Sequence, residues 1–331
     1  MIEAVSQTFT TVQAWLFEHA VQPLLYTFGW MRFQETAYDA TEWFLLGVVQ
    51  IVLLYVLLRP LEARMPAEHW DDRRQTRVDI LYTLLHRLGI VPLGLFLLLT
   101  PLFDELAVAL RAVGFTPLAL DTVWPGVTDV PVVSFLIYLV VLDFVDYWLH
   151  RAQHRFEWWW ALHAVHHSQR QMSFWADDRN HLLDDLILDA VKAALALAIG
   201  VEPAQFVLLI VATRVLQSVQ HANVRTAFGP LGRLLVSPLF HRRHHAIGVG
   251  HEGAYRGCNF AVLFPVWDVL FGTADFDPAV EPTGIRDQLP SPRGTERDYG
   301  RGFWSQQWLG LVRLAGRRQQ LAEERPGAAG T

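Results

Sequence analysis

The chain has one cysteine, Cys258, among its 331 residues. A single thiol cannot form a disulfide within the chain, and it cannot supply the several cysteine ligands of an iron–sulfur cluster. The sequence therefore excludes an internal disulfide framework and a built-in ferredoxin-type cluster. We interpret Cys258 as a small buried residue rather than as a redox centre.

Charged residues are also scarce, at 18% of the chain, whereas hydrophobic residues make up 52%. Thirteen tryptophans and twenty phenylalanines add to this apolar character. The composition is typical of an integral membrane protein rather than of a large soluble domain. The net charge of −6, with no aromatics interleaved among the basic residues, argues against a nucleic-acid-binding surface.

Several apolar segments approach the roughly 20 residues that a helix needs to cross a membrane. In chain order they are residues 41–58, a stretch within 78–103, 130–149, 183–201 and 203–222. The last two are separated by Glu202-Pro203 and predict a helical hairpin. The 183–201 segment carries four charged residues and is the weakest span. We therefore expect an all-α membrane protein with four or five transmembrane helices and a histidine-rich cap on the cytoplasmic side.

Composition divides the chain into three parts. Residues 1–129 contain a helix at the membrane interface, around residues 8–30, and the first two spans. Residues 130–275 form the histidine-rich catalytic region. Residues 276–331 form a tail rich in Pro, Gly, Arg and Glu, which is expected to be partly disordered.

Arginine distribution predicts the orientation in the membrane. The loops 59–77, 150–181 and 223–258 hold five, four and five arginines, whereas the opposite loop, 104–129, holds one. The positive-inside rule places the three arginine-rich loops, with all histidine clusters, in the cytoplasm. Arginine outnumbers lysine by 26 to 1, which indicates a GC-rich bacterial genome and hence a bacterial inner membrane.

Ten of the fourteen histidines lie between residues 150 and 245, and eight of them form three clusters. The clusters are His150 and His154; His163, His166 and His167; and His241, His244 and His245. On a helix, spacings of three and four residues place side chains on one face. Neutral imidazole is the commonest metal ligand among side chains. Because a structural zinc takes four ligands and a catalytic one usually three, eight histidines predict two metal ions.

The three clusters match, in order, the HxxxH, HxxHH and HxxHH boxes of the fatty acid hydroxylase/sterol desaturase superfamily, which this sequence resembles. Asn259-Phe260 and the run from Trp267 to Thr273 resemble the ending of the family's domain. The resemblance covers about residues 130–275. It implies an integral membrane enzyme in which histidines hold two iron ions that use O2 to hydroxylate or desaturate lipids.

The resemblance also implies metal ligands between the boxes. His181 lies in an Arg-x-His sequence like the one that follows the second box in family members, and His221 ends the fifth apolar segment. We include both among the candidate metal ligands. His251 is left unassigned. Arg214, inside the fifth segment, either binds a substrate head group or pairs with an aspartate, and pairing is favoured.

Two aspartates, Asp143 and Asp146, are candidates for orienting the metal ligands. With His150 they are spaced i, i+3 and i+7, which places all three on one helical face. Carboxylates commonly orient ligating imidazoles, and a carboxylate within a span costs about 2.5–3.5 kcal/mol at the bilayer centre. The alternative is that both lie near the interface and pair with Arg151 or Arg155.

Three aspartates of the fourth apolar segment, Asp184, Asp185 and Asp189, pose the same question, and there we favour structural pairing. Asp184 follows His181 by three residues, where family members often carry an acidic residue. By resemblance alone, Asn259 is a further candidate for hydrogen bonding near the catalytic site.

The predicted activity is O2-dependent hydroxylation, or desaturation, of a lipid. The sequence shows no haem, flavin or iron–sulfur motif, so electrons must come from a ferredoxin, a cytochrome or an NAD(P)H-fed reductase. Two alternatives remain. A membrane metal transporter or metal-binding protein could use the same histidines, although transporters place their ligands near the bilayer midplane. An inactive, lipid-binding relative is disfavoured because all three boxes are intact.

Overall fold

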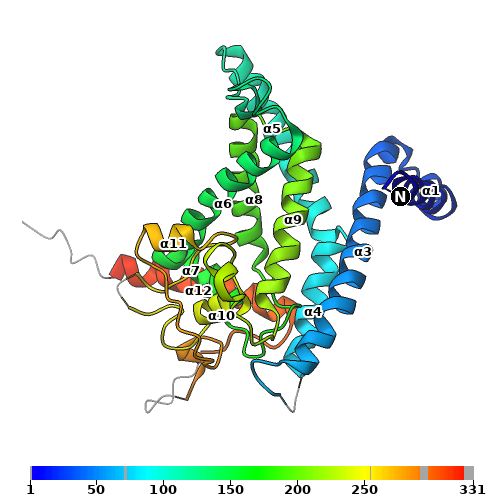
Figure 1. Cartoon of the computed structure of the whole chain (residues 1–331). Helices are drawn as coiled ribbons and strands as arrows, with labels where there is room; N and C mark the ends of the chain where they lie inside the picture. The colour runs from blue at the N-terminus through cyan, green and yellow to red at the C-terminus, as the bar shows by residue number, and fades with distance from the viewer. Residues whose placement is uncertain (1, 71–72, 254, 291–296, 324–331) are drawn as a thin grey trace, which may run out of the picture.

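The computed structural model describes residues 2–70, 73–253, 255–290 and 297–323 (Figure 1). Within these ranges the chain is helical, and β structure is limited to two isolated bridges, Pro66 with Val224 and Ala246 with Thr283. The expected all-α fold is therefore confirmed.

The α-helices of the described ranges follow the apolar segments and the histidine boxes. They are α1 (Ile2–Leu16), α2 (Gln22–Thr27), α3 (Gln34–Arg64), α4 (Arg74–Arg87), α5 (Ile90–Ala112), α6 (Pro131–Arg155), α7 (Glu157–His167), α8 (Leu182–Ile199), α9 (Pro203–His221), α10 (Pro238–His244), α11 (Val266–Leu270) and α12 (Phe303–Glu323). Helices α6, α9 and α10 each begin with proline, whose fixed φ and missing N–H suit the first helical position.

Among the described residues, three helical stretches are long and apolar enough to cross a membrane: Met31–Arg64, which contains α3, then α5 and α6. Many of their apolar side chains face outward. Leu57 of α3, Leu98 of α5 and Val132 of α6 are each more than half exposed. Outward-facing apolar surface of this extent suits contact with lipid rather than with water.

The hairpin expected around Glu202-Pro203 is present as α8 and α9. The two helices run beside α6 (Figure 1). Leu209 of α9 packs against Tyr138 and Leu142 of α6, and Leu195 of α8 packs against the same cluster. The hairpin therefore completes a bundle with α6 whatever its depth in the membrane.

One end of the helical bundle carries the cap formed by α7, α10, α11 and α12, as Figure 1 shows. The opposite end carries residues 113–130 and the α8–α9 turn. The three arginine-rich loops therefore share one end of the molecule, as the predicted topology requires.

The N-terminal helices pack against the end of α3 that is remote from the cap. Phe17, in a π-helical turn between α1 and α2, lies edge-on to Tyr38 with ring centroids 5.2 Å apart, and Gln13 donates a hydrogen bond to the Tyr38 carbonyl. Trp15 and Trp30 are more than half exposed. Their exposure agrees with the expected interfacial position of this segment.

The C-terminal part is ordered where α12 packs on α7. The Arg313 guanidinium donates to the Ala161 carbonyl at 3.1 Å, which ties the two helices together. The sequence predicts disorder for the last residues; 324–331 lie outside the described residues.

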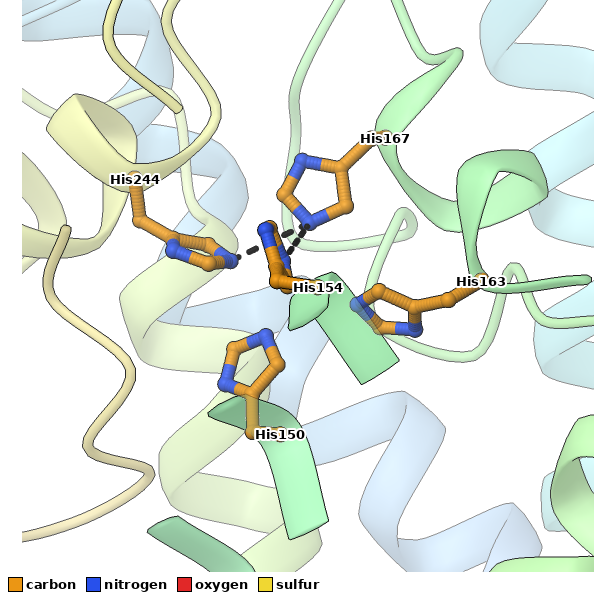
Figure 2. Close-up of side chains that lie close together, drawn as sticks. All are labelled: His150, His154, His163, His167 and His244. Atoms are coloured by element: carbon orange, nitrogen blue, oxygen red, sulfur yellow. Dashed lines mark hydrogen bonds between the residues drawn. The ribbon is translucent and has the colours of Figure 1, made fainter. Parts of the chain in front are cut away.

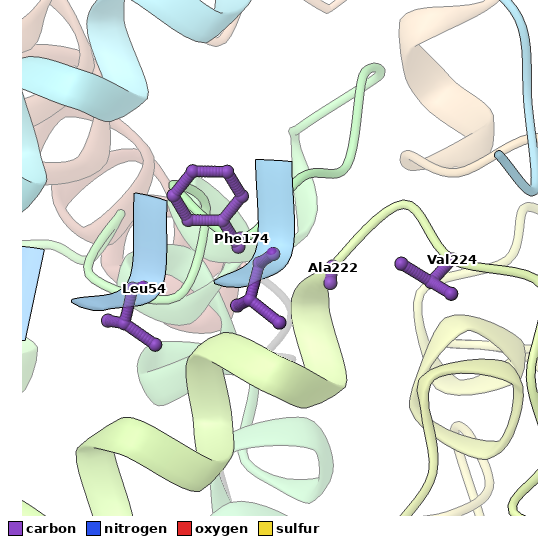
Figure 3. Close-up of a cluster of buried hydrophobic side chains, with 5 residues drawn as sticks. Leu54, Phe174, Ala222 and Val224 are labelled. Carbon is purple, nitrogen blue, oxygen red and sulfur yellow. The ribbon is translucent and has the colours of Figure 1, made fainter. Parts of the chain in front are cut away.

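A small apolar cluster joins α3 to the end of α9 beside the cap. Its buried members are Leu54, Leu58, Phe174, Ala222 and Val224 (Figure 3). Phe174 comes from the loop between α7 and α8, so this cluster fixes that loop against the first span.

Candidate metal centre

The first histidine box lies at the end of α6 next to the cap, and the other two lie within the cap helices α7 and α10. His150 and His154 are on the last turns of α6, and the second box occupies the C-terminal half of α7. The chain turns at Phe156, the junction of α6 and α7, so the second box folds back against the first. The third box ends α10, and His221 is the last residue of α9.

Nine histidines gather into two groups, in each of which one ring nitrogen per residue lies within 4.8 Å of the others. Site A consists of His150, His154, His163, His167 and His244, and site B consists of His166, His221, His241 and His245. None of the nine is more than 8% exposed. Figure 2 shows the five rings of site A turned toward one another.

The adjacent histidines of each HxxHH box serve different sites. His167 belongs to site A and His166 to site B, and likewise His244 belongs to site A and His245 to site B. Successive residues of a helix differ by about 100° in direction, so two neighbouring side chains cannot both face one ion. The rings of His167 and His245 stack with centroids 4.3 Å apart. The two sites are therefore direct neighbours.

The Nε2 atoms within each site are spaced like ligands around an ion. In site A, the His167 Nε2 lies 3.1 Å from the Nε2 atoms of both His154 and His244. In site B, the successive Nε2 separations are 3.2 Å for His166–His221, 3.0 Å for His221–His241 and 3.2 Å for His241–His245. Metal–nitrogen bonds of about 2.0–2.1 Å place neighbouring ligand atoms about 3.0–3.4 Å apart.

The opposite ring nitrogen, Nδ1, faces a hydrogen-bond acceptor in six of the nine histidines. The acceptors are carbonyls for His150 (Phe260, 2.8 Å), His154 (Arg256, 3.1 Å), His166 (Arg179, 3.3 Å), His221 (Gln217, 2.9 Å) and His244 (Cys258, 2.7 Å), and the Asp184 carboxylate for His163 (3.2 Å). An Nδ1 that donates its proton leaves Nε2 with a lone pair.

These lone pairs point at one another, which is repulsive unless a cation lies between them. The buried Nε2 atoms of His150 and His163 also have no hydrogen-bond partner. Orphaned buried nitrogens are rare in folded proteins, and here they point toward the other rings of site A. The donor set therefore fits two metal ions. Imidazole suits Zn, Cu, Fe and Ni alike, so the ligands alone do not select the metal.

Burial keeps the box histidines of the cap neutral. It lowers the pKa of His244 to about 3 and lowers the pKa values of His166, His167, His241 and His245 well below their ordinary value, and the neighbouring histidines add to the effect. Neutral imidazole is the form that binds metal.

Acid is expected to destabilise the metal-free protein. In the unfolded chain these histidines have pKa values near 6.5, so the unfolded state binds more protons at lower pH and folding stability falls as pH drops below about 6.5. At pH 5.5 the loss is about 1.4 kcal/mol for each fully buried histidine. The effect is measured by thermal unfolding of the metal-free protein in a non-ionic detergent, at pH values from 7.5 to 5.0. A melting temperature independent of pH over this range would contradict the burial of the cluster.

Asp184 of α8 is the carboxylate that contacts a histidine of the metal centre. It is fully buried. Its Oδ2 accepts from His163 Nδ1 at 3.2 Å, and its Oδ1 accepts from the Trp159 indole at 2.6 Å. Gln153 donates to both oxygens at 2.9 Å. A carboxylate on the far nitrogen of a ligating imidazole holds the ring in position. The sequence favoured structural pairing alone for Asp184, whereas its contact with His163 suits a residue that orients a metal ligand.

Changing Asp184 to Asn is expected to lower metal affinity or turnover by about 10–100-fold, the usual effect of losing such a partner. The metal content and the turnover rate of each variant are the measurements. Asp189→Asn, on the same helix but without a hydrogen bond to a histidine in the described part of the chain, is the matched control. Equal metal content and equal rates in the two variants would rule out an orienting role.

Asp143 and Asp146, the candidates for orienting the metal ligands, have partners other than His150 among the described residues. Asp143 accepts from the backbone N–H groups of Leu263 and Phe264 and from the Trp267 indole, and Asp146 lies 3.7 Å from the Lys192 ammonium. The shared helical face does not decide the partner, because α6 packs there against the segment before α11 and against α8. Within the described residues, neither carboxylate pairs with Arg151 or Arg155.

His181 and Asn259 also lie apart from the metal sites. His181 caps α8, accepting from the Leu183 N–H, and its Nε2 lies 2.9 Å from the Gln307 carbonyl of α12. Asn259 joins the Phe240 carbonyl to the backbone of Asp275. Both residues shape the walls of the cap rather than join either histidine group.

The two residues that the sequence left open have defined surroundings. The His251 ring stacks on Trp160 with centroids 3.4 Å apart and lies 5.6 Å from the His154 ring. The Arg214 carbonyl accepts from the buried Arg87 guanidinium, which pairs with two aspartates. This contact uses the backbone of Arg214, so the pairing of its side chain with an aspartate stays a prediction.

Comparison with known proteins supports a lipid-oxidising role. Residues 135–273 match the family model described as fatty acid hydroxylase. The ornithine lipid hydroxylase OlsE of Rhizobium tropici is 28% identical over 241 residues, covering 72% of this chain and 68% of that protein. Alkylglycerol monooxygenases of Caenorhabditis elegans and Homo sapiens are 28% and 30% identical, covering 42% and 40% of this chain. The chain spans 26% and 28% of their respective lengths. No solved structure matches the chain.

Proposed function

We propose that this chain, a member of the fatty acid hydroxylase family through its domain at residues 135–273, is an O2-dependent lipid hydroxylase or desaturase. Its cofactor would be two iron ions, one held by site A and the other by site B. The enzyme would be an integral protein of a bacterial inner membrane, with the metal centre on the cytoplasmic side.

The observation that carries the proposal is the division of nine buried histidines between two adjacent sites. Each HxxHH box contributes to both sites, so the boxes specify a pair of ions rather than two unrelated ones. Paired iron ions supply what oxygen chemistry needs when they are bound, namely the binding and reduction of O2 and the oxidation of a C–H bond.

The chain's own residues position and shield the ions. Carbonyls of residues 256–260 and the Asp184 carboxylate hold four of the five site A rings by their Nδ1 atoms. The fully buried Phe260 lies against the rings of His150 and His154 and excludes water from that side. Such shielding favours oxidation of a bound substrate over unproductive release of reduced oxygen.

Lipid as the substrate is supported by the relatives, two of which are named for ornithine lipids and alkylglycerols. The position of the histidines supports it too, because they lie where α6 and α9 leave the apolar bundle. The electrons would come from a separate ferredoxin, cytochrome or NAD(P)H reductase. The cytoplasmic orientation rests on the arginine-rich loops at the cap end.

Metal content and oxygen uptake together test the proposal. Protein purified from iron-replete cells is expected to hold about two irons per chain, and lipids of expressing cells should gain one oxygen or lose two hydrogens relative to a deletion strain. Removing the iron with a chelator should abolish oxygen uptake coupled to reductant, and adding ferrous iron back should restore it. Metal flux into sealed vesicles, without oxygen uptake, would favour the transporter alternative instead.

A further inference from the structure

A cavity of about 280 Å³ lies at the cap end of α3, apart from the nine histidines. Its lining includes Arg59, Glu62, Thr76, Ser173, Trp175 and Asn223. These residues come from the end of the first span, from α4, from the loop between α7 and α8, and from the segment after α9. Four separate parts of the chain therefore converge on one polar space.

Three hydrogen-bonding groups of this lining are buried and have no partner: Arg59 Nη1, Thr76 Oγ1 and Ser173 Oγ. Ser173 is only 2% exposed. Buried polar groups are nearly always paired, because an unmet donor loses its hydration without compensation. Three such groups around one cavity indicate a ligand that brings several acceptor atoms.

One oxygen of each carboxylate in the lining is already engaged. Glu62 accepts from the backbone N–H groups of Phe174 and Asn223 at 3.0 and 2.9 Å. Glu68 pairs with the Arg242 guanidinium. Arg59 and Arg73 of the lining, in contrast, form no ion pair within the described part of the chain, so the cavity offers a ligand guanidinium groups and two unpaired hydroxyls. This combination suits an oxyanion.

The cavity adjoins the apolar cluster around Leu58 and the segment that follows α9. Arg59 directly follows Leu58, a member of the apolar cluster in Figure 3, to which the cavity residue Trp175 also packs. On the other wall, Asn223 follows the site B ligand His221 by two residues. A molecule with an oxyanion in this cavity would have its apolar part on the membrane side.

We propose that this cavity binds the phosphate or carboxylate group of a lipid and so selects lipids with an anionic head group. The proposed binding depends only on the cavity. The proposed role in substrate choice also depends on the proposed lipid oxidation. Arg59 would pair with the oxyanion, and the hydroxyls of Thr76 and Ser173 would donate to its remaining oxygens.

The test compares three probes on the full chain, loaded with iron, in a non-ionic detergent. Dihexanoyl phosphatidic acid carries chains and an oxyanion, dihexanoylglycerol carries the same chains without it, and inorganic phosphate carries the oxyanion alone. The phosphatidic acid is expected to bind at least about tenfold more tightly than the other two, because a charge-assisted hydrogen bond is worth about a tenfold change or more. Phosphate that binds as tightly as the lipid would overturn the lipid assignment.

Variants locate the site. Arg59→Gln should weaken phosphatidic acid binding about tenfold or more. Arg64→Gln, at an exposed arginine near the end of α3 and outside the cavity lining, should leave it unchanged. Ser173→Ala should weaken binding about threefold or more without lowering the melting temperature, because it deletes an unpaired hydroxyl. Unchanged binding in Arg59→Gln and Ser173→Ala would overturn the proposal.

The two proposals fail in different ways. If the chain does not oxidise lipids, oxygen uptake is absent in every variant, yet the binding differences persist. If the cavity does not bind the head group, oxidation continues, and Arg59→Gln and Arg64→Gln show the same preference among lipids.

Discussion

Replacing His244 or His166 with alanine is expected to lower lipid oxidation by more than about 100-fold, since losing a residue that only orients a ligand already costs about 10–100-fold. His244 belongs to site A and His166 to site B, so each variant removes a ligand from a different ion. Iron content should fall in both variants. If one variant lost both irons, the two sites would bind iron cooperatively. Neither residue lies in a candidate membrane span, so both variants should remain in the membrane.

His19→Ala is the matched control for this pair. His19 lies in the N-terminal helical segment and is exposed, and among the described residues it contacts Trp15, through a hydrogen bond to the carbonyl one turn back and ring stacking. It should therefore keep full iron content and full activity. Metal analysis, oxygen uptake and membrane fractionation are the measurements. Full activity in either His244→Ala or His166→Ala would refute the assignment of these histidines to the metal centre.

The histidine boxes were predictable from sequence because their ligands lie at helical spacings within short segments. The number of clustered imidazoles also predicted two ions. It did not predict which histidine serves which ion. That division depends on how α6, α7 and α10 face one another, and it becomes clear only when His166 and His167 are found on opposite sides of the boundary between the sites.

Asp143 and Asp146 show that a shared helical face does not identify the partner of a side chain. The positions of Asp143 and Asp146 relative to His150 gave the correct direction around α6 but could not give the partner, which comes from the segment before α11 or from α8. For Asp184 the sequence favours structural pairing. Its contact with His163 joins residues 21 positions apart. The acidic position after His181 was the one signal for it, and that signal came from resemblance.

Long-range packing also explains His181. An Arg-x-His sequence after the second box suggested a ligand, but α12 docks at this point and its Gln307 carbonyl lies next to the imidazole. The position of a helix more than a hundred residues further along the chain leaves no local pattern. The hairpin at Glu202-Pro203, in contrast, was predictable because its signals, two apolar runs and a proline, are local.

Replacing Arg87 with leucine is expected to destabilise the fold by about 3–5 kcal/mol, the usual cost of removing one member of a buried ion-pair cluster. The Arg87 guanidinium at the end of α4 donates to Asp178 at 2.9 Å, to Asp177 at 2.7 Å and to Ser218 of α9 at 2.6 Å. Its side chain and those of both aspartates are buried. Without the cation, two carboxylates would remain buried against each other.

The metal centre should respond to the same substitution. Asp177 and Asp178 immediately precede Arg179, whose carbonyl accepts from the His166 Nδ1 of site B, so loosening this loop frees a ligand ring. Arg77→Leu, at an exposed position of α4, is the control and should melt like the parent protein. Adding Asp177→Asn and Asp178→Asn to Arg87→Leu should recover part of the lost stability, because neutral groups remove the unpaired charge. Thermal unfolding in detergent and iron content are the measurements. If Arg87→Leu and Arg77→Leu melt at the same temperature, the cluster does not stabilise the loop behind site B.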